Sequence, residues 1–201
     1  AAIAPDGTSS SVITNSYFVG NDMANKYKGA TVASLVMDPN DLLDYNTGIL
    51  ALGAYYDEWR KTAEAKQIIQ SKAYWNYEGN YTQSGKDWER QATMDYIDPS
   101  TGNVEFSAPM GVRLHGGASR MYGQKSFKFY MREEYGQKNL KYALIPGDVD
   151  KDGKQIKKYK GFMLRNGGND TELTKIRDVF IQSCITDRAY GTQAARPCVL
   201  F

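Results

Sequence analysis

The chain has 201 residues, of which 41% are hydrophobic and 24% are charged, and its formal net charge is +2. These values are ordinary for a globular domain that can bury a substantial core. The near-neutral charge gives no indication of a nucleic-acid partner, and no apolar run is long enough to span a bilayer. We therefore expect neither nucleic acid binding nor a membrane span.

Two cysteines and one histidine limit the chemistry that the chain can carry. Cys184 and Cys198 are too few for a disulfide framework, so we expect both to be buried free thiols. A single disulfide between them is the alternative. A metal site built from several histidines of one chain is excluded. A Ser-His-Asp or Cys-His enzyme would have to use His115, for which a structural role on a strand is the simpler interpretation.

The first part of the chain predicts a loose segment followed by short elements. Residues 1–30 are small and polar with weak periodicity, which indicates a loosely ordered lead-in. The apolar segment Thr31–Met37 predicts a buried strand. Asp38 can cap a short helix whose first position suits Pro39. The segment Gly48–Gly53 is predicted to form another strand.

The middle of the chain predicts one long helix and a hairpin. The helix is expected from Tyr56 to Tyr74, because apolar residues recur there at helical spacing: Trp59, Thr62, Ala65, Ile68 and Ile69. Alternation in Trp88–Ile97 predicts a strand, and turn residues follow at 98–103. Val104–Phe106 is expected to pair back as the second strand of the hairpin.

The segment Gly111–Arg132 combines two alternating stretches with a glycine-rich loop between them. Alternation up to His115 predicts a strand, and the small residues of 116–119 then predict an exposed loop. After Gly123 the alternation resumes. It places four side chains on one face of a second strand: Lys125, Phe127, Phe129 and Met131.

Lys125 is a cation on an otherwise apolar face. A lysine on an inner face is costly unless it meets an anion or a carboxylate, so Lys125 is a candidate phosphate or carboxylate partner. The alternative is that Lys125 begins the strand and its ammonium group reaches solvent. Lys128 lies on the polar face and is more simply explained as solvated. The P-loop motif does not fit, because Ser119 and Gln124 occupy its glycine positions.

An acidic run resembles the first half of a calcium loop. Asp148, Asp150 and Asp152 have the required spacing, which makes them candidates for a weak calcium site. The twelfth position of such a loop holds Tyr159 where an acidic residue is needed, so an acidic turn between strands is the simpler alternative. The segment Tyr159–Leu164 is predicted to form a strand.

A second glycine-rich turn, at 165–170, precedes the other main helix. Asp170 or Thr171 is expected to cap a helix that runs to about Arg188. Its apolar side chains predict a buried stripe: Leu173, Ile176, Val179, Phe180 and Cys184. The segment Cys198–Phe201 is predicted to form a last strand. Together these elements predict an α+β fold with a mainly antiparallel sheet and two principal helices.

Several motifs, in this order, resemble the CotH family, the spore-coat-protein-H-like kinases. They are DLLDYNTGILALG, WERQATMDYID, GVRLHGGASR with QKSFKFY, LRNGGND, IRDVFIQS and TQAARPCVLF. The similarity extends from about Thr31 to Phe201. It implies that residues 31–201 form the N-terminal part of an atypical protein-kinase-like fold. It also implies ATP and Mg²⁺ or another divalent metal as cofactors, serine phosphorylation of coat or secreted proteins, and a spore-coat or extracellular location.

The resemblance also assigns cofactor-binding residues. Lys125 matches the lysine after the glycine loop, with Lys128 as the alternative. The loop that would lie over the nucleotide phosphates contains four further residues: Gly116, Gly117, Ser119 and Arg120. The metal-binding and catalytic aspartates of the family should follow the strand that begins at Pro197. We therefore expect a fragment that supplies the nucleotide-facing lobe, contains no catalytic residue and is inactive alone.

Two non-catalytic functions are alternatives. The first is an extracellular module that binds a glycan or a protein, because aromatic faces stack on sugars and peptides. Its candidate residues are Trp59, Trp75, Trp88 and the tyrosine-rich segment Tyr74–Tyr81. The second is a structural spore-coat component that uses a kinase scaffold for interaction only, since a fold does not establish a chemistry.

Overall fold

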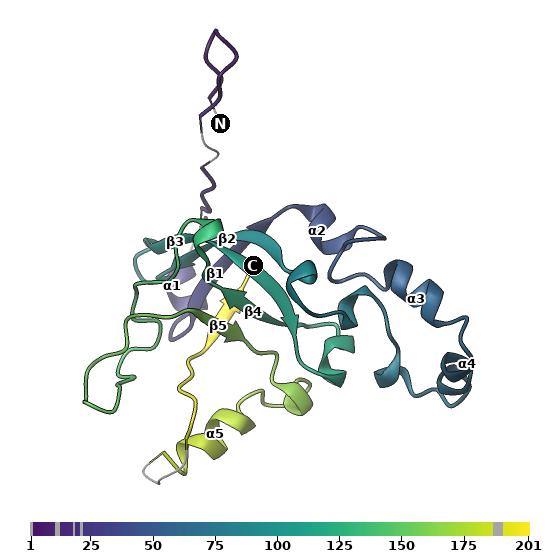
Figure 1. Ribbon diagram of the computed structural model, residues 1–201. Helices are drawn as coiled ribbons and strands as arrows, with labels where there is room; N and C mark the ends of the chain where they lie inside the picture. Colours follow the sequence, from purple (N-terminus) through teal and green to yellow (C-terminus); the bar gives the residue numbers. More distant parts are fainter. Residues whose placement is uncertain (1, 11–12, 18, 21, 187–190) are drawn as a thin grey trace. The chain divides into compact units, whose positions relative to one another are not determined.

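The computed structural model describes residues 2–10, 13–17, 19–20, 22–186 and 191–201 (Figure 1). The helices in these ranges are α1 (Met23–Lys26), α2 (Pro39–Leu43), α3 (Gly53–Trp59), α4 (Ala63–Gln70) and α5 (Arg177–Ser183). The strands are β1 (Thr31–Met37), β2 (Arg90–Ile97), β3 (Val104–His115), β4 (Ser126–Tyr130), β5 (Gly161–Leu164) and β6 (Cys198–Leu200). None of the helices in these ranges is long and apolar enough to cross a membrane.

The strands form a sheet of mixed direction, in the order β5-β4-β3-β2-β1-β6. The pairs β3–β4 and β4–β5 are antiparallel, whereas β1 and β6 are parallel. The predicted α+β class is confirmed. The predicted sheet is correct for the antiparallel pairs but omits the parallel one, because alternation within a strand carries no information about the direction of its neighbour.

The chain divides into two compact units. One unit contains Ala1–Val36, Thr93–Ala108 and Pro197–Phe201, and the other contains Met37–Ala92 and Pro109–Arg196. In the first unit, the predicted strands at Thr31 and Cys198 are confirmed, and these two residues are register partners. Tyr96 fixes this region, because its hydroxyl lies 3.1 Å from the Thr31 hydroxyl and its ring stacks on Phe106 at 5.0 Å.

The core of the second unit lies between β3, β4 and β5. Phe129 is fully buried and stacks on Phe162 with ring centroids 5.0 Å apart. Met131 is also buried, so the predicted apolar face of β4 is confirmed at these positions. The prediction for β3 is incomplete, because the strand runs without interruption from Val104 to His115 where two separate strands were expected.

The long helix predicted for Tyr56–Tyr74 is wrong, because the structure has two helices there. The first, α3, ends at Trp59, and α4 begins at Ala63. Thr62 causes the break: its hydroxyl accepts a hydrogen bond from the Ala65 amide at 3.1 Å and caps α4. A residue counted as part of a helical stripe is therefore the start of a new helix.

The strand predicted for Gly48–Gly53 is also wrong. The amides of Ile49 and Leu50 donate hydrogen bonds to the carbonyls of Asp41 and Leu42, at 2.9 Å each. These bonds fold the apolar run back onto α2, and α3 begins at Gly53. The helix start predicted at Asp38 is confirmed, because its carboxylate accepts a hydrogen bond from the Asn40 amide at 2.9 Å.

The helix predicted to begin at Asp170 starts later, at Arg177. The Asp170 carboxylate accepts hydrogen bonds from the Thr174 hydroxyl at 2.6 Å and the Arg177 amide at 3.2 Å, so it organises the turn before α5. The expected end near Arg188 lies outside the described residues. Within them, α5 ends at Ser183.

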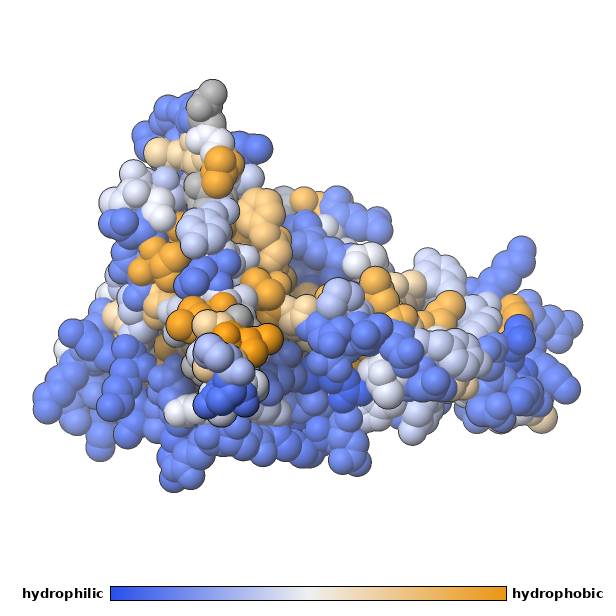
Figure 2. All heavy atoms as spheres, turned by 90° about the horizontal axis from the view of Figure 1, so that it is seen from above, coloured by the Kyte–Doolittle hydropathy of each residue, from blue (hydrophilic) through white to orange (hydrophobic). Residues whose placement is uncertain are grey.

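The buried stripe predicted for this helix is wrong. Its largest side chains are exposed, with Leu173 at 69%, Ile176 at 62% and Phe180 at 64%. No disulfide joins Cys184 and Cys198, and neither is buried as expected: Cys184 is exposed and Cys198 is partly exposed. Large apolar side chains elsewhere are exposed too, and Figure 2 shows hydrophobic patches between hydrophilic residues on one face.

Candidate functional site

A cleft of about 480 Å³ lies beside the glycine-rich loop, within the second unit. The loop supplies one part of its lining: Gly116, Gly117, Ala118, Arg120 and Met121. Aromatic side chains from α3 and from the segment after α4 supply another part: Trp59, Trp75, Tyr77 and Tyr81. Glu64 and Glu78 also line the cleft. The cleft therefore combines backbone of small residues, aromatic rings and carboxylates.

The conformation of the loop depends on Gly116. This residue follows β3 directly and has a φ of +121°, in a region that favours glycine. A Cβ atom at Gly116 would overlap the Ser119 hydroxyl, whereas one at Gly117 would meet open space. A short 3-10 helix, Ala118–Met121, completes the turn. The small residues thus allow the backbone itself to border the cleft.

Arg120 joins the loop to the opposite segment. Its Nη1 donates hydrogen bonds to the carbonyls of Thr82 at 2.6 Å and Gln83 at 3.2 Å. Its Nε atom is buried and has no hydrogen-bond partner in the described part of the chain. Burial lowers the pKa of Arg120 from its ordinary value. Arg120 therefore holds a poorly solvated positive charge at the cleft, with one donor still to be satisfied.

Lys125 follows the loop in the chain and is absent from the cleft lining. Its ammonium group donates a hydrogen bond to the Arg120 carbonyl at 2.5 Å and lies 5.0 Å from the centre of the Tyr81 ring. Burial lowers the pKa of Lys125. Lys125 is partly buried and directly precedes β4. The ammonium group has a carbonyl and an aromatic ring as neighbours, and no described carboxylate forms an ion pair with it.

The remaining predicted residues lie in different surroundings. The Lys128 ammonium lies 5.3 Å from the Tyr130 ring, outside the cleft lining. The Ser119 hydroxyl lies close to Gly116, outside the cleft lining. His115 is the last residue of β3, opposite Ser126, and burial together with nearby Lys128, Arg120 and Arg165 lowers its pKa. Among the six predicted cofactor-binding residues, three line the cleft: Gly116, Gly117 and Arg120.

The acidic run forms a turn closed by its own backbone. The Asp150 carboxylate accepts hydrogen bonds from the amides of Asp152 at 2.9 Å and Lys154 at 3.0 Å. In the described ranges, no three His, Cys, Asp or Glu side chains lie together in a way that could hold a metal ion. The described residues therefore do not fit the divalent metal that the resemblance implies.

Sequence reasoning missed that the aromatic residues face the glycine loop. The motifs in the sequence assign Trp75 and the loop to different functions, yet both border one cleft. Trp75 is 51% exposed and meets Tyr74 edge-on at 5.1 Å. Trp88 is not part of this cleft, because its ring packs edge-on against Tyr55 at 5.4 Å. No spacing rule connects these aromatic residues with the loop, since only tertiary folding brings them together.

Sequence reasoning also missed a buried carboxylate that binds several cations. The side chain of Glu89 is fully buried and accepts hydrogen bonds from Arg132 Nε at 2.7 Å and Nη2 at 2.9 Å. The Lys86 ammonium and the Tyr135 hydroxyl each lie 2.9 Å from Glu89 Oε1, and Arg113 Nε lies 3.2 Å from Oε2. Burial raises the pKa of Glu89, but the hydrogen bonds from Arg132, Lys86 and Tyr135 outweigh it and lower the pKa to about 2.

No family model matches the chain, and neither a curated protein nor a solved structure matches it.

Proposed function

We propose that the chain is the nucleotide-facing part of a CotH-like protein kinase and that ATP binds in the cleft beside Gly116–Met121. The observation that carries the proposal is the Arg120 guanidinium, whose buried Nε lacks a partner at a cleft bordered by glycine backbone. An oxyanion would satisfy this donor. The aromatic rings of the cleft offer surfaces on which a base can stack.

Lys125 supports the loop in this proposal. Its hydrogen bond to the Arg120 carbonyl constrains the loop, and this bond would have to break before the ammonium group could meet a phosphate. The described residues do not fit a divalent metal, so the proposal assigns them nucleotide binding and no step of phosphoryl transfer. The expected protein substrate, a coat or secreted protein, belongs to the same proposal and rests on the resemblance.

Replacement of Arg120 by alanine is expected to weaken ATP binding about tenfold, because a charge-assisted hydrogen bond is lost. Isothermal titration of the chain with ATP in the presence of a chelator measures this effect. Lys128→Ala is the matched control, since it removes one positive charge from outside the cleft lining. Circular dichroism verifies that both variants fold. Failure of the folded wild-type chain to bind ATP, or equal losses in the two variants, would contradict the proposal.

A second candidate function is the binding of a sugar through the aromatic side chains of the same cleft. It is favoured by the half-exposed ring of Trp75 beside Glu64 and Glu78. Sugars stack on aromatic faces, and carboxylates accept hydrogen bonds from their hydroxyl groups. The same carboxylates repel phosphates, so they separate the two candidates.

Replacement of Glu64 by glutamine is the experiment that separates them. It removes a negative charge from the cleft and is expected to strengthen ATP binding about twofold. If the cleft binds a sugar, Trp75→Ala removes the signal on a glycan array. Tyr45→Ala, which removes a similarly exposed ring outside the cleft, leaves that signal unchanged. A chain that gives no glycan signal rules out the second candidate among the sugars displayed.

A further inference from the structure

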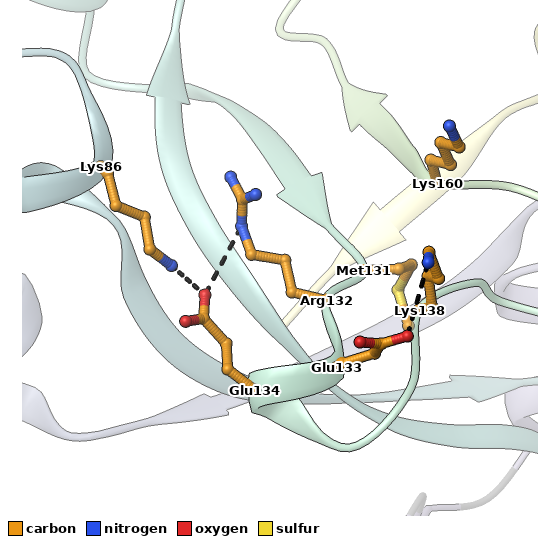
Figure 3. Close-up of a pocket in the computed structure, with 7 residues that line it drawn as sticks. All are labelled: Lys86, Met131, Arg132, Glu133, Glu134, Lys138 and Lys160. Atoms are coloured by element: carbon orange, nitrogen blue, oxygen red, sulfur yellow. Dashed lines mark hydrogen bonds and ion pairs between the residues drawn. The ribbon is translucent and has the colours of Figure 1, made fainter.

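A second hollow, of about 630 Å³, lies on another part of the second unit (Figure 3). Four cations and two carboxylates line it: Lys86, Arg132, Lys138, Lys160, Glu133 and Glu134. Positive side chains are therefore in excess. None of them belongs to the cleft beside the glycine loop, so this hollow is a separate site.

The buried Glu89 carboxylate holds two of these cations in place. It binds Arg132 through two hydrogen bonds and Lys86 through one, while Arg113 lies 3.2 Å away. The Tyr135 hydroxyl lies 3.1 Å from the Lys86 ammonium and adds a further constraint. One carboxylate thus positions three cations, and its single negative charge leaves most of their positive charge uncompensated.

Glu134 occupies the place between Lys86 and Arg132. Figure 3 shows both cations directed toward its carboxylate, with Lys86 bonded to it and Arg132 Nε 3.7 Å from it. The side chain of Glu134 is 50% exposed, as is that of Lys86. Ion pairs this exposed are weak, so an external anion can replace the carboxylate.

The other two cations lie on the far side of Arg132 in this view. Lys138 pairs with Glu133 at 3.5 Å, but these side chains are 70% and 77% exposed. Lys160 forms no ion pair with any described residue, and its backbone carbonyl accepts a hydrogen bond from the Met131 amide at 2.9 Å. Both lysines raise the positive potential around the place that Glu134 occupies.

We propose that this hollow binds a phosphate monoester between Lys86 and Arg132, and that Glu134 is an internal competitor for the same place. A phosphate monoester carries up to two negative charges and three acceptor oxygens, so it can bind an arginine and a lysine at once. The single carboxylate of Glu134 can match neither the charge nor the number of acceptors. The source of the ester is either a small molecule or a phosphoserine side chain, which share this chemistry.

The test titrates the whole chain separately with three ligands: O-phosphoserine, a peptide that contains phosphoserine, and sulfate. Changes in the NMR chemical shifts of the backbone amides measure the binding of each. Glu134→Gln is expected to tighten phosphoserine binding about fivefold, because the competitor loses its charge. Lys86→Ala is expected to weaken it about tenfold. Lys151→Ala removes an exposed lysine of the acidic turn, and serves as the control for the change in net charge.

Each outcome decides the proposal. Tighter binding in Glu134→Gln together with weaker binding in Lys86→Ala supports it, and preference for the peptide over O-phosphoserine identifies a protein as the source. Equal binding of sulfate and O-phosphoserine, or equal effects of Lys86→Ala and Lys151→Ala, means an adventitious ion only and overturns it. Because Lys86 also binds Glu89, the double variant Lys138→Ala/Lys160→Ala provides a second test that leaves that network intact. If O-phosphoserine binds the double variant and Glu134→Gln as tightly as it binds the wild-type chain, the proposal is overturned.

Discussion

Replacement of Glu89 by glutamine will lower the free energy of unfolding by about 3 kcal/mol, because it removes the charge of a fully buried carboxylate that binds three cations. Arg132 loses two charge-assisted hydrogen bonds, and Arg113 and Lys86 lose their nearest buried anion. Glutamine keeps the size of the side chain, so the loss measures charge and hydrogen bonding more than packing. Urea unfolding followed by circular dichroism gives the value.

The same substitution will change the response to acid. The folded pKa of Glu89, about 2, lies below its ordinary value of 4.5. The stability that the carboxylate contributes is therefore fully present above about pH 4.5 and is lost as the pH falls toward 2. The wild-type chain should lose stability across this window, and the Glu89→Gln variant should lose less.

Glu134→Gln is the matched control, because it removes the exposed carboxylate that binds Lys86 and lies 3.7 Å from Arg132 Nε. Its effect on the free energy of unfolding should stay below about 1 kcal/mol. Equal effects of the two substitutions on the free energy of unfolding would show that burial does not determine how much Glu89 contributes to stability.

Replacement of Phe129 by alanine will destabilise the chain by about 4 kcal/mol, the loss typical of a large ring removed from a core. Phe129 is fully buried in β4 and stacks on Phe162 of β5, so its removal leaves a cavity between two strands. Thermal and urea unfolding measure the loss. Phe127→Ala is the control on the same strand: this ring is partly exposed and should cost roughly half as much. A smaller loss at Phe129 than at Phe127 would contradict the assignment of the core.

Alternation predicts β4 correctly because the predicted apolar face holds buried side chains: Phe129 in the strand and Met131 just after it. The helix start at Asp38 is predictable for a similar reason, since capping depends on neighbouring residues only. Helical periodicity predicts one helix across Thr62 where the structure has two. A threonine that caps a helix can have the same sequence spacing as a threonine inside one, so spacing alone does not distinguish them. The same periodicity predicts a buried Phe180, which is exposed in the structure. Spacing identifies the apolar face of a helix but does not show whether another part of the chain covers that face.

The candidate site is predictable in part. The sequence places Lys125 on an inner face, and the structure agrees that it is not solvated freely, but its hydrogen-bond partner is the Arg120 carbonyl. That partner depends on the shape of the loop, which residue types do not define. No sequence pattern predicts the group of cations around Glu89. Lys86 lies in the short 3-10 helix Lys86–Trp88, Arg113 lies in β3, and Arg132 lies in the segment after β4.

The parallel pairing of β1 with β6 has a consequence for the order of events during folding. Thr31 and Cys198 are register partners although almost the whole described chain lies between them. The entropic cost of closing a loop grows with its length, so such a contact forms after the local ones. The hairpin-like pairing of β3 with β4 can form early. During synthesis, the edge of β1 that pairs with β6 stays unpaired until residues 198–200 have been made.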